Sequence, residues 1–179
     1  MAEAKARILL VDDSPLLQIT QRHLTHAGHE VLAATTGQEA LRLVRDAHPD
    51  IILVDANLPD TEGVEVCRQI RAEATLDDVA VLLISGQRTD TGYPAQGFEA
   101  GADGYITRPI PPRELLARVE AIVRLQQTAV ELQRERDLVT EVMETSPVGI
   151  LVVSPEGEIT YANASAEELL GPVQRVMTD

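Results

Sequence analysis

Three aspartates that follow two short apolar runs could bind a cation. Asp12 and Asp13 come directly after Arg7–Val11, and Asp55 comes directly after Ile51–Val54. If these runs are neighbouring parallel strands, the three carboxylates meet at one edge of a sheet, where like charges need a compensating cation or proton. Oxygen ligands without His or Cys are typical of a hard ion, magnesium above all. The spacing therefore predicts a Mg²⁺ site that could also hold a phosphoryl group.

Two further polar side chains follow later apolar runs. Ser85 directly follows the run Val79–Ile84, and Arg108 comes shortly after Gly104–Ile106. A hydroxyl and a cation at the same edge could bind the oxygens of a phosphoryl group on Asp55. Each acid alone could equally be a helix cap or a loop residue, but the joint placement of all five groups favours a phosphoryl site.

Five strand-like runs alternate with helical stretches up to about residue 125. Most of the runs are continuously apolar, which is typical of strands covered on both faces. The alternation predicts an α/β fold with a doubly wound five-stranded parallel sheet, whose functional cleft lies beyond the carboxyl ends of the strands. The runs are Arg7–Val11, Glu30–Ala34, Ile51–Val54, Val79–Ile84 and Gly104–Ile106.

Capping signals mark the helices between these runs. Ser14 before Pro15 predicts the start of the first helix, and Gly28 predicts its end. Thr36 with Glu39 forms the pattern of a capping box at the start of the second helix. A third helix is expected from about residue 63 to 73.

The bulk composition argues against several function classes. The 179 residues carry a formal net charge of -14, so we expect no nucleic-acid partner. The single cysteine, Cys67, excludes an intramolecular disulfide and fits a reducing cytoplasm. No apolar run approaches the roughly 20 residues of a membrane-spanning helix. We therefore expect a cytoplasmic segment without membrane contact.

A long charged stretch follows the fifth run. Residues 113–145 contain no Gly or Pro, so the last helix, which begins at Pro111-Pro112, is expected to extend beyond the domain. Apolar residues recur at steps of four and three, a heptad pattern interrupted by Arg136. A two-stranded parallel coiled coil, and hence a homodimer, is favoured over a single surface helix. The predicted seam is Ile122, Leu125, Ala129, Leu132, Val139 and Met143.

The pattern changes again from Ser146-Pro147 onward. Strand-like runs at 149–153 and 158–161 flank a turn at Ser154–Gly157, and residues 164–170 are helical in pattern. A segment this short cannot bury a self-sufficient core. We expect the opening of a second domain that continues in a longer protein.

Three segments resemble the receiver family of response regulators: Val11–Pro15, Asp55–Gly63 and Gly101–Pro109, which read VDDSP, DANLPDTEG and GADGYITRP. The resemblance covers residues 5 to about 125 and implies a flavodoxin-like receiver fold. It also implies a two-component phosphorelay, in which Asp55 accepts a phosphoryl group from a histidine kinase or phosphotransfer protein. Ser85 matches the hydroxyl residue that moves to the phosphoryl group, and Tyr105 the aromatic residue that swings inward. The implied Mg²⁺ ligands are Asp12, Asp13, Asp55 and the backbone carbonyl of Asn57.

Two features depart from the receiver pattern. The family normally has lysine at the position of Arg108, and this exchange is not conservative. A second interpretation is therefore a pseudo-receiver that binds partners or dimerises without productive phosphorylation. The stretch 86–101 contains Gly92, Pro94 and Gly97, so we expect a shortened or mobile fourth helix.

Residues 146–179 resemble the start of a PAS sensor domain, through the segments Ser146–Ile150, Gly157–Asn163 and Ala166–Gly171. We therefore expect a receiver domain at 5–125, a last receiver helix extended into a coiled-coil linker at 113–145, and an incomplete α+β PAS segment at 146–179. No nucleotide-binding motif is present, so we expect no enzyme in these residues. A third interpretation is the N-terminal part of a sensor histidine kinase.

Overall fold

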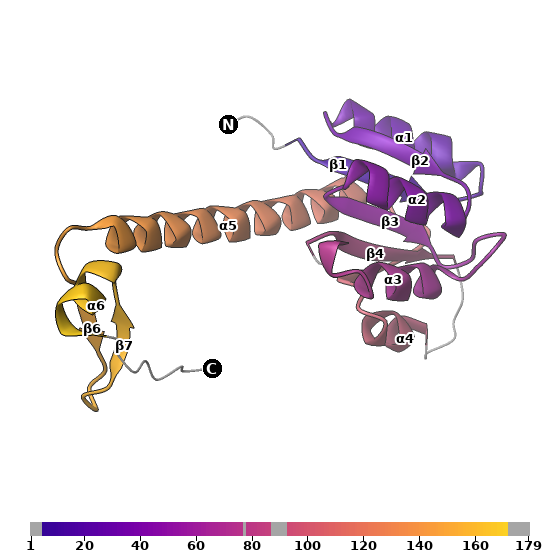
Figure 1. Cartoon of the computed structure of the whole chain (residues 1–179). Coiled ribbons are helices and arrows are strands. Elements are labelled where there is room, and N and C mark those ends of the chain that lie inside the picture. Colours follow the sequence, from indigo (N-terminus) through magenta and orange to yellow (C-terminus); the bar gives the residue numbers. More distant parts are fainter. Residues whose placement is uncertain (1–4, 77, 87–92, 172–179) are drawn as a thin grey trace. The chain divides into compact units, whose positions relative to one another are not determined.

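The computed structural model describes residues 5–76, 78–86 and 93–171. The chain divides after Gln126 into two compact units (Figure 1). None of the described helices combines the length and hydropathy that crossing a bilayer requires.

The first unit contains the predicted parallel sheet. Its strand order is β2-β1-β3-β4-β5, and every neighbouring pair is parallel. This order is that of the flavodoxin-like doubly wound fold, so the predicted fold class is confirmed. The strands are β1 (Arg7–Val11), β2 (Glu30–Ala34), β3 (Ile51–Asp55), β4 (Ala80–Ser85) and β5 (Gly104–Thr107).

Helices cover both faces of this sheet (Figure 1). One buried cluster joins one side of the strands to α2, α3 and α4, and a second joins the other side to α1 and the first turns of α5. Because both faces are covered, β3 and β4 are buried along their whole length and β1 is buried from Ile8 onward, which explains their apolar sequences. The helices are α1 (Leu16–His26), α2 (Gly37–Ala47), α3 (Gly63–Arg71), α4 (Tyr93–Glu99) and α5 (Pro112–Thr145), with a 3₁₀ turn at Ala74–Leu76.

The register of the central strands fixes the position of the acidic residues. Val11 of β1 pairs with Val54 of β3. Asp12 and Asp55 are the next residues on each chain, so they lie side by side at the carboxyl edge of the sheet. This confirms the strand adjacency on which the predicted site depended.

Several helix boundaries differ from the sequence expectation. The Thr36 hydroxyl accepts a hydrogen bond from the Glu39 N–H, as in a capping box, but the Glu39 carboxylate accepts from the N–H of Thr35 instead of Thr36. Helix α3 ends at Arg71, two residues earlier than expected, and the 3₁₀ turn follows it. Helix α4 has seven residues, and the preceding residues 87–92, including Gly92, lie outside the described part of the chain.

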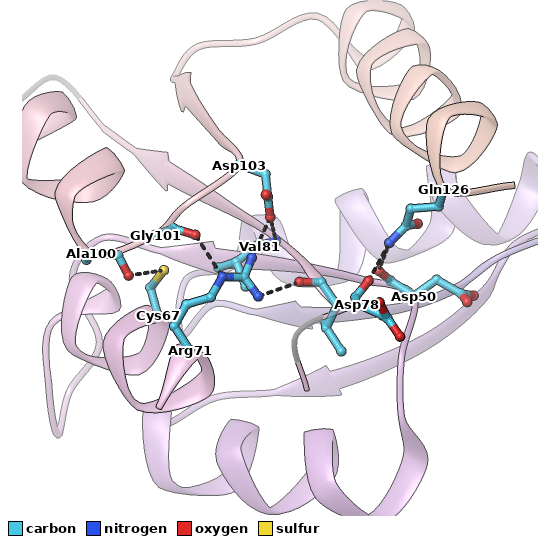
Figure 2. A network of polar contacts seen from close by, with 10 residues as sticks. Asp50, Cys67, Arg71, Asp78, Val81, Ala100, Gly101, Asp103 and Gln126 are labelled. Atoms are coloured by element: carbon cyan, nitrogen blue, oxygen red, sulfur yellow. Dashed lines mark hydrogen bonds and ion pairs between the residues drawn. The ribbon is translucent and has the colours of Figure 1, made fainter. Parts of the chain in front are cut away.

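A polar network ties the elements of the first unit together (Figure 2). The Arg71 guanidinium, at the end of α3, donates to the backbone oxygens of Gly101 and Val79 and to the Asp103 carboxylate. The Gln126 side-chain amide donates to the backbone oxygens of Asp50 and Asp78, at 2.9 Å each. These two oxygens precede β3 and β4, so Gln126 fixes α5 at the sheet edge opposite to Asp55.

The second unit contains an antiparallel pair of strands and a short helix. Strands β6 (Leu151–Val153) and β7 (Ile159–Ala162) form a hairpin, followed by α6 (Ala164–Leu170). β6 begins two residues later than expected. Gly157 closes the hairpin turn with φ +91°, and its N–H donates to the Ser154 carbonyl.

Candidate functional site

Asp12 and Asp55 are both held by the turn that follows their strand. One carboxylate oxygen of Asp12 accepts from the N–H of Ser14 at 2.7 Å, and one of Asp55 accepts from the N–H of Asn57 at 2.8 Å. Each side chain therefore caps the first turn after its strand, and one oxygen of each carboxylate remains for another partner.

Arg108 is that partner for both carboxylates. Its Nη1 donates to Oδ2 of Asp55 at 2.9 Å, and its Nη2 donates to Oδ2 of Asp12. The backbone N–H of Arg108 also donates to the Ser85 carbonyl at 2.7 Å, which continues the pairing of β5 with β4. The side chains of Asp12, Asp55 and Arg108 are 1%, 11% and 16% exposed. One planar guanidinium thus bridges two buried carboxylates.

The surroundings of Asp55 favour its neutral form. Burial raises the pKa of Asp55 above its ordinary value, and the charges of Asp12 and Asp13 raise it further. The hydrogen bond from Asn57 and the charge of Arg108 lower this pKa but do not cancel the effect of burial. A raised pKa of a carboxyl at a sheet edge is a common feature of functional sites.

An open cleft of about 710 Å³ lies beside these residues, and Asp13, Asp55 and Arg108 are part of its lining. Leu16 and Ile19 of α1 line the same cleft and are 46% and 52% exposed. The acidic residues therefore lie next to an exposed apolar surface.

The loop after β3 requires Gly63. A Cβ atom at this position would lie 2.3 Å from the backbone oxygen of Asp55, so any other residue would displace the Asp55 backbone. Asp60 connects the same loop to α2, since its carboxylate accepts from the N–H groups of Gly37 and Gln38 at the start of that helix. These hydrogen bonds lower the pKa of Asp60.

Ser85 and Tyr105 lie on β4 and β5 near the site, and neither side chain forms a hydrogen bond with Asp55 among the described interactions. Ser85 is fully buried, and its hydroxyl donates to the carbonyl of Gly86 at 2.8 Å. The Tyr105 hydroxyl is buried and has no hydrogen-bond partner among the described residues. Its ring lies against that of Tyr93, with centroids 6.2 Å apart. The switching roles of Ser85 and Tyr105 stay predictions.

Sequence reasoning missed Tyr93. This buried residue at the start of α4 donates from its hydroxyl to the carbonyl of Ala56, directly after Asp55, at 3.0 Å. Burial raises the pKa of Tyr93 to about 12, so the hydroxyl stays protonated and can donate at neutral pH. The one available signal was composition, because aromatic residues make up only 2% of the chain.

The expected Mg²⁺ ligands have suitable atoms, but in the described part of the chain they are not arranged around an ion. The oxygen donors of Asp12, Asp13 and Asp55 suit Mg²⁺ in type. Among the residues that the structure describes, however, no three acidic, His or Cys side chains are arranged to hold a metal ion. Arg108 binds Asp12 and Asp55 instead. In this conformation the residues do not fit the ion, and the ligand set, including the Asn57 carbonyl, stays a prediction.

The strand order and the acidic cleft at the carboxyl edge define a receiver-like α/β protein. A family model of the response regulator receiver domain matches residues 8–120, and one of the PAS domain matches residues 137–178. The chain therefore belongs to the response regulator receiver domain family.

Individual relatives agree with this assignment. The alkaline phosphatase synthesis transcriptional regulatory protein PhoP of Bacillus subtilis is 33% identical over 164 residues, which are 91% of this chain and 66% of PhoP. The phosphate regulon transcriptional regulatory protein PhoB of Pseudomonas aeruginosa is 38% identical over 118 residues, which are 65% of this chain and 51% of PhoB. This chain thus spans between about half and two thirds of these curated relatives.

A solved structure shows the same fold. The chemotaxis response regulator CheY4 of Vibrio cholerae superimposes with a TM-score of 0.62 at 30% identity, and the match covers 66% of this chain and 99% of CheY4.

Proposed function

We propose that Asp55 accepts a phosphoryl group from a histidine kinase or a phosphotransfer protein in a two-component phosphorelay. The observation that carries this proposal is the position of Asp55, which ends β3 and lines the open cleft while Arg108 binds one of its oxygens. A carboxylate nucleophile beside a fixed cation is suited to phosphoryl transfer, where catalysis consists mainly of positioning and charge stabilisation.

In this reaction an ionised Asp55 oxygen attacks the phosphorus of a phosphohistidine. A P–O bond forms, the P–N bond breaks, and the imidazole leaves with the electron pair and takes up a proton. The product is an acyl phosphate whose oxygens take the place of the Asp55 carboxylate as acceptors for Arg108. Ser85 can join them if its hydroxyl turns away from Gly86.

Leu16 and Ile19 provide a surface for the phosphohistidine partner. Both are exposed on α1 and line the cleft that contains Asp55, together with Pro109 and Ile110. A partner that brings a histidine to Asp55 must cover this apolar rim. The proposed partner therefore contacts α1 through apolar side chains of its own.

We further propose the organisation expected from the sequence: a receiver at 5–125, a coiled-coil linker at 113–145 and a PAS segment at 146–179. Helix α5 is continuous from Pro112 to Thr145, and it exposes Leu125, Leu132 and Val139 of the heptad seam. A homodimer through this seam would bury them. A cytoplasmic location is part of the proposal and agrees with the buried free thiol of Cys67.

The pseudo-receiver remains a second candidate, and the engagement of Asp55 by Arg108 favours it. A third candidate is that these residues are part of a sensor histidine kinase, and the length of the complete gene would test this.

Acetyl phosphate separates the first two candidates. The full chain is incubated with acetyl phosphate and Mg²⁺, and its intact mass is measured. We expect a phosphoryl adduct that is lost in Asp55→Ala and kept in Asp46→Asn, a matched change at an exposed residue of α2. Failure to form an adduct under any condition would support the pseudo-receiver.

A further inference from the structure

We propose that Arg108 is an internal counter-ion that competes with a divalent cation for Asp12 and Asp55. Metal can bind only after the guanidinium has released these carboxylates. This inference rests on the proposed function, because it concerns the regulation of the same site.

The geometry assigns the free oxygen of each carboxylate to Arg108. Oδ1 of Asp12 and Oδ1 of Asp55 accept from backbone N–H groups of their own turns. Oδ2 of each, the remaining oxygen, accepts from Arg108. A metal ion that binds these residues therefore meets oxygens that already have a cationic partner.

The planar fork of arginine makes this competition specific. Its Nη1 and Nη2 atoms reach two different carboxylates at the same time. A lysine has one compact ammonium group, which is a point charge on a flexible stem. A lysine would therefore hold the two carboxylates less firmly than Arg108 does, because the rigid guanidinium donates a separate charge-assisted hydrogen bond to each of them. The residue type at position 108 thus sets how strongly a cation is excluded.

Burial strengthens the exclusion. The three side chains are at most 16% exposed, so water screens the repulsion between the guanidinium and an incoming cation only weakly. Two cations on the same pair of oxygens repel each other, so the guanidinium has to move for the ion to bind. Arg108 also lines the open cleft beside Asp55, so the space next to it is open.

This arrangement has a functional consequence. Arg108 would neutralise Asp12 and Asp55 in place of a divalent ion. If the negative charge of a phosphoryl group in the cleft drew the guanidinium away, the two carboxylates would be left to hold such an ion.

Calorimetric titration of the full chain with MgCl₂ tests the proposal. Arg108→Lys keeps the charge and removes the fork, and Arg108→Met removes the charge but keeps much of the apolar stem. Because one or both of the charge-assisted hydrogen bonds from Arg108 no longer have to be broken, we expect both variants to bind Mg²⁺ about tenfold more tightly than the parent, or more. Arg42→Lys, at an exposed ion pair of α2, should bind as the parent does.

Parent-like or weaker Mg²⁺ binding by both Arg108 variants would overturn the proposal. A variant that is too unstable for calorimetry is measured by its melting temperature in EDTA and in MgCl₂. We expect a larger Mg²⁺-dependent rise in melting temperature for Arg108→Met than for the parent, and an equal or smaller rise would again count against the competition.

The acetyl phosphate experiment keeps the two proposals apart. Tighter Mg²⁺ binding in Arg108→Lys without any adduct in the parent would support the counter-ion and reject the phosphoacceptor function. An adduct in the parent together with unchanged Mg²⁺ affinity in both Arg108 variants would do the reverse.

Discussion

Asn163 donates from its side-chain amide to the backbone carbonyl of Met143 at 2.8 Å, which joins the end of β7 to the last turns of α5. The same amide nitrogen donates to the Val148 carbonyl, and the amide oxygen accepts from the N–H groups of Ile150 and Ala166. Asn163 is fully buried. One side chain thus connects the long helix to the hairpin and to α6 within the second unit.

Asn163→Asp should loosen this junction. A carboxylate can still accept from Ile150 and Ala166, but it cannot donate to Met143 or Val148 and places a charge among carbonyl oxygens. We expect a loss of about 2 kcal/mol or more in the local stability of residues 139–171. Hydrogen exchange of the amides in this range measures it, and Gln133→Ala, at an exposed side chain of α5, is the control. Unchanged exchange in Asn163→Asp would show that its amide donor does not hold the junction.

Asp55→Asn should stabilise the protein at neutral pH. The folded state raises the pKa of Asp55, so the ionised form is less favourable in the folded than in the unfolded chain. Below the unfolded pKa, about 3.9, both states are protonated and this cost is absent. It develops as the pH rises through the folded pKa and stays constant above it.

The melting temperature of Asp55→Asn is therefore expected to exceed that of the parent by an amount that grows from about pH 4 upward and then levels off. Asp46→Asn, at an exposed carboxylate, should show no such growth. An equal or lower melting temperature of Asp55→Asn at pH 7 would contradict the effect of burial on Asp55.

Gly63→Ala should disturb both the fold and the site. The added Cβ would lie 2.3 Å from the Asp55 backbone oxygen, and a backbone atom cannot move aside as a flexible side chain can. We expect a destabilisation of about 3 kcal/mol, at the upper end of overpacking effects. Urea unfolding measures it. Gly86→Ala is the matched control, because a Cβ there meets nothing within 4 Å, and equal stability of the two variants would contradict the close approach.

The parts of the site that the sequence predicted are those set by the backbone. Strand order and burial follow from continuous apolar runs, and these place Asp12, Asp13 and Asp55 at one edge. The two carboxylate partners of Arg108 could not be predicted in this way, because a long side chain has many rotamers. Its position depends on contacts with Asp55 and Asp12, which lie 53 and 96 residues earlier in the sequence. Tyr93 and Asn163 were not predicted for a similar reason, since their roles depend on backbone groups that only the folded chain brings to their side chains.

Leu16→Glu and Ile19→Glu should separate partner docking from chemistry. Both residues are exposed on α1 and line the cleft, but neither contacts Asp55 through an ion pair or hydrogen bond among the described interactions. We expect phosphoryl transfer from a phosphohistidine protein to slow by about tenfold or more, because an apolar contact is replaced by a charge. Adduct formation with acetyl phosphate should stay within about twofold of the parent. Phe98→Glu, at an exposed residue of α4, is the control. Equal slowing with the phosphohistidine protein and with acetyl phosphate would argue against a docking role.

Leu132→Asp should abolish the proposed dimer, whereas Val130→Asp should not. Both residues are more than half exposed on α5, but only Leu132 belongs to the heptad seam, so the two changes add the same charge at an inner and an outer position of the coiled coil. Sedimentation of the full chain at micromolar concentration should give a dimer for the parent and Val130→Asp and a monomer for Leu132→Asp. A monomeric parent would refute the coiled coil, and a monomer with both variants would mean that the interface does not follow the heptad seam.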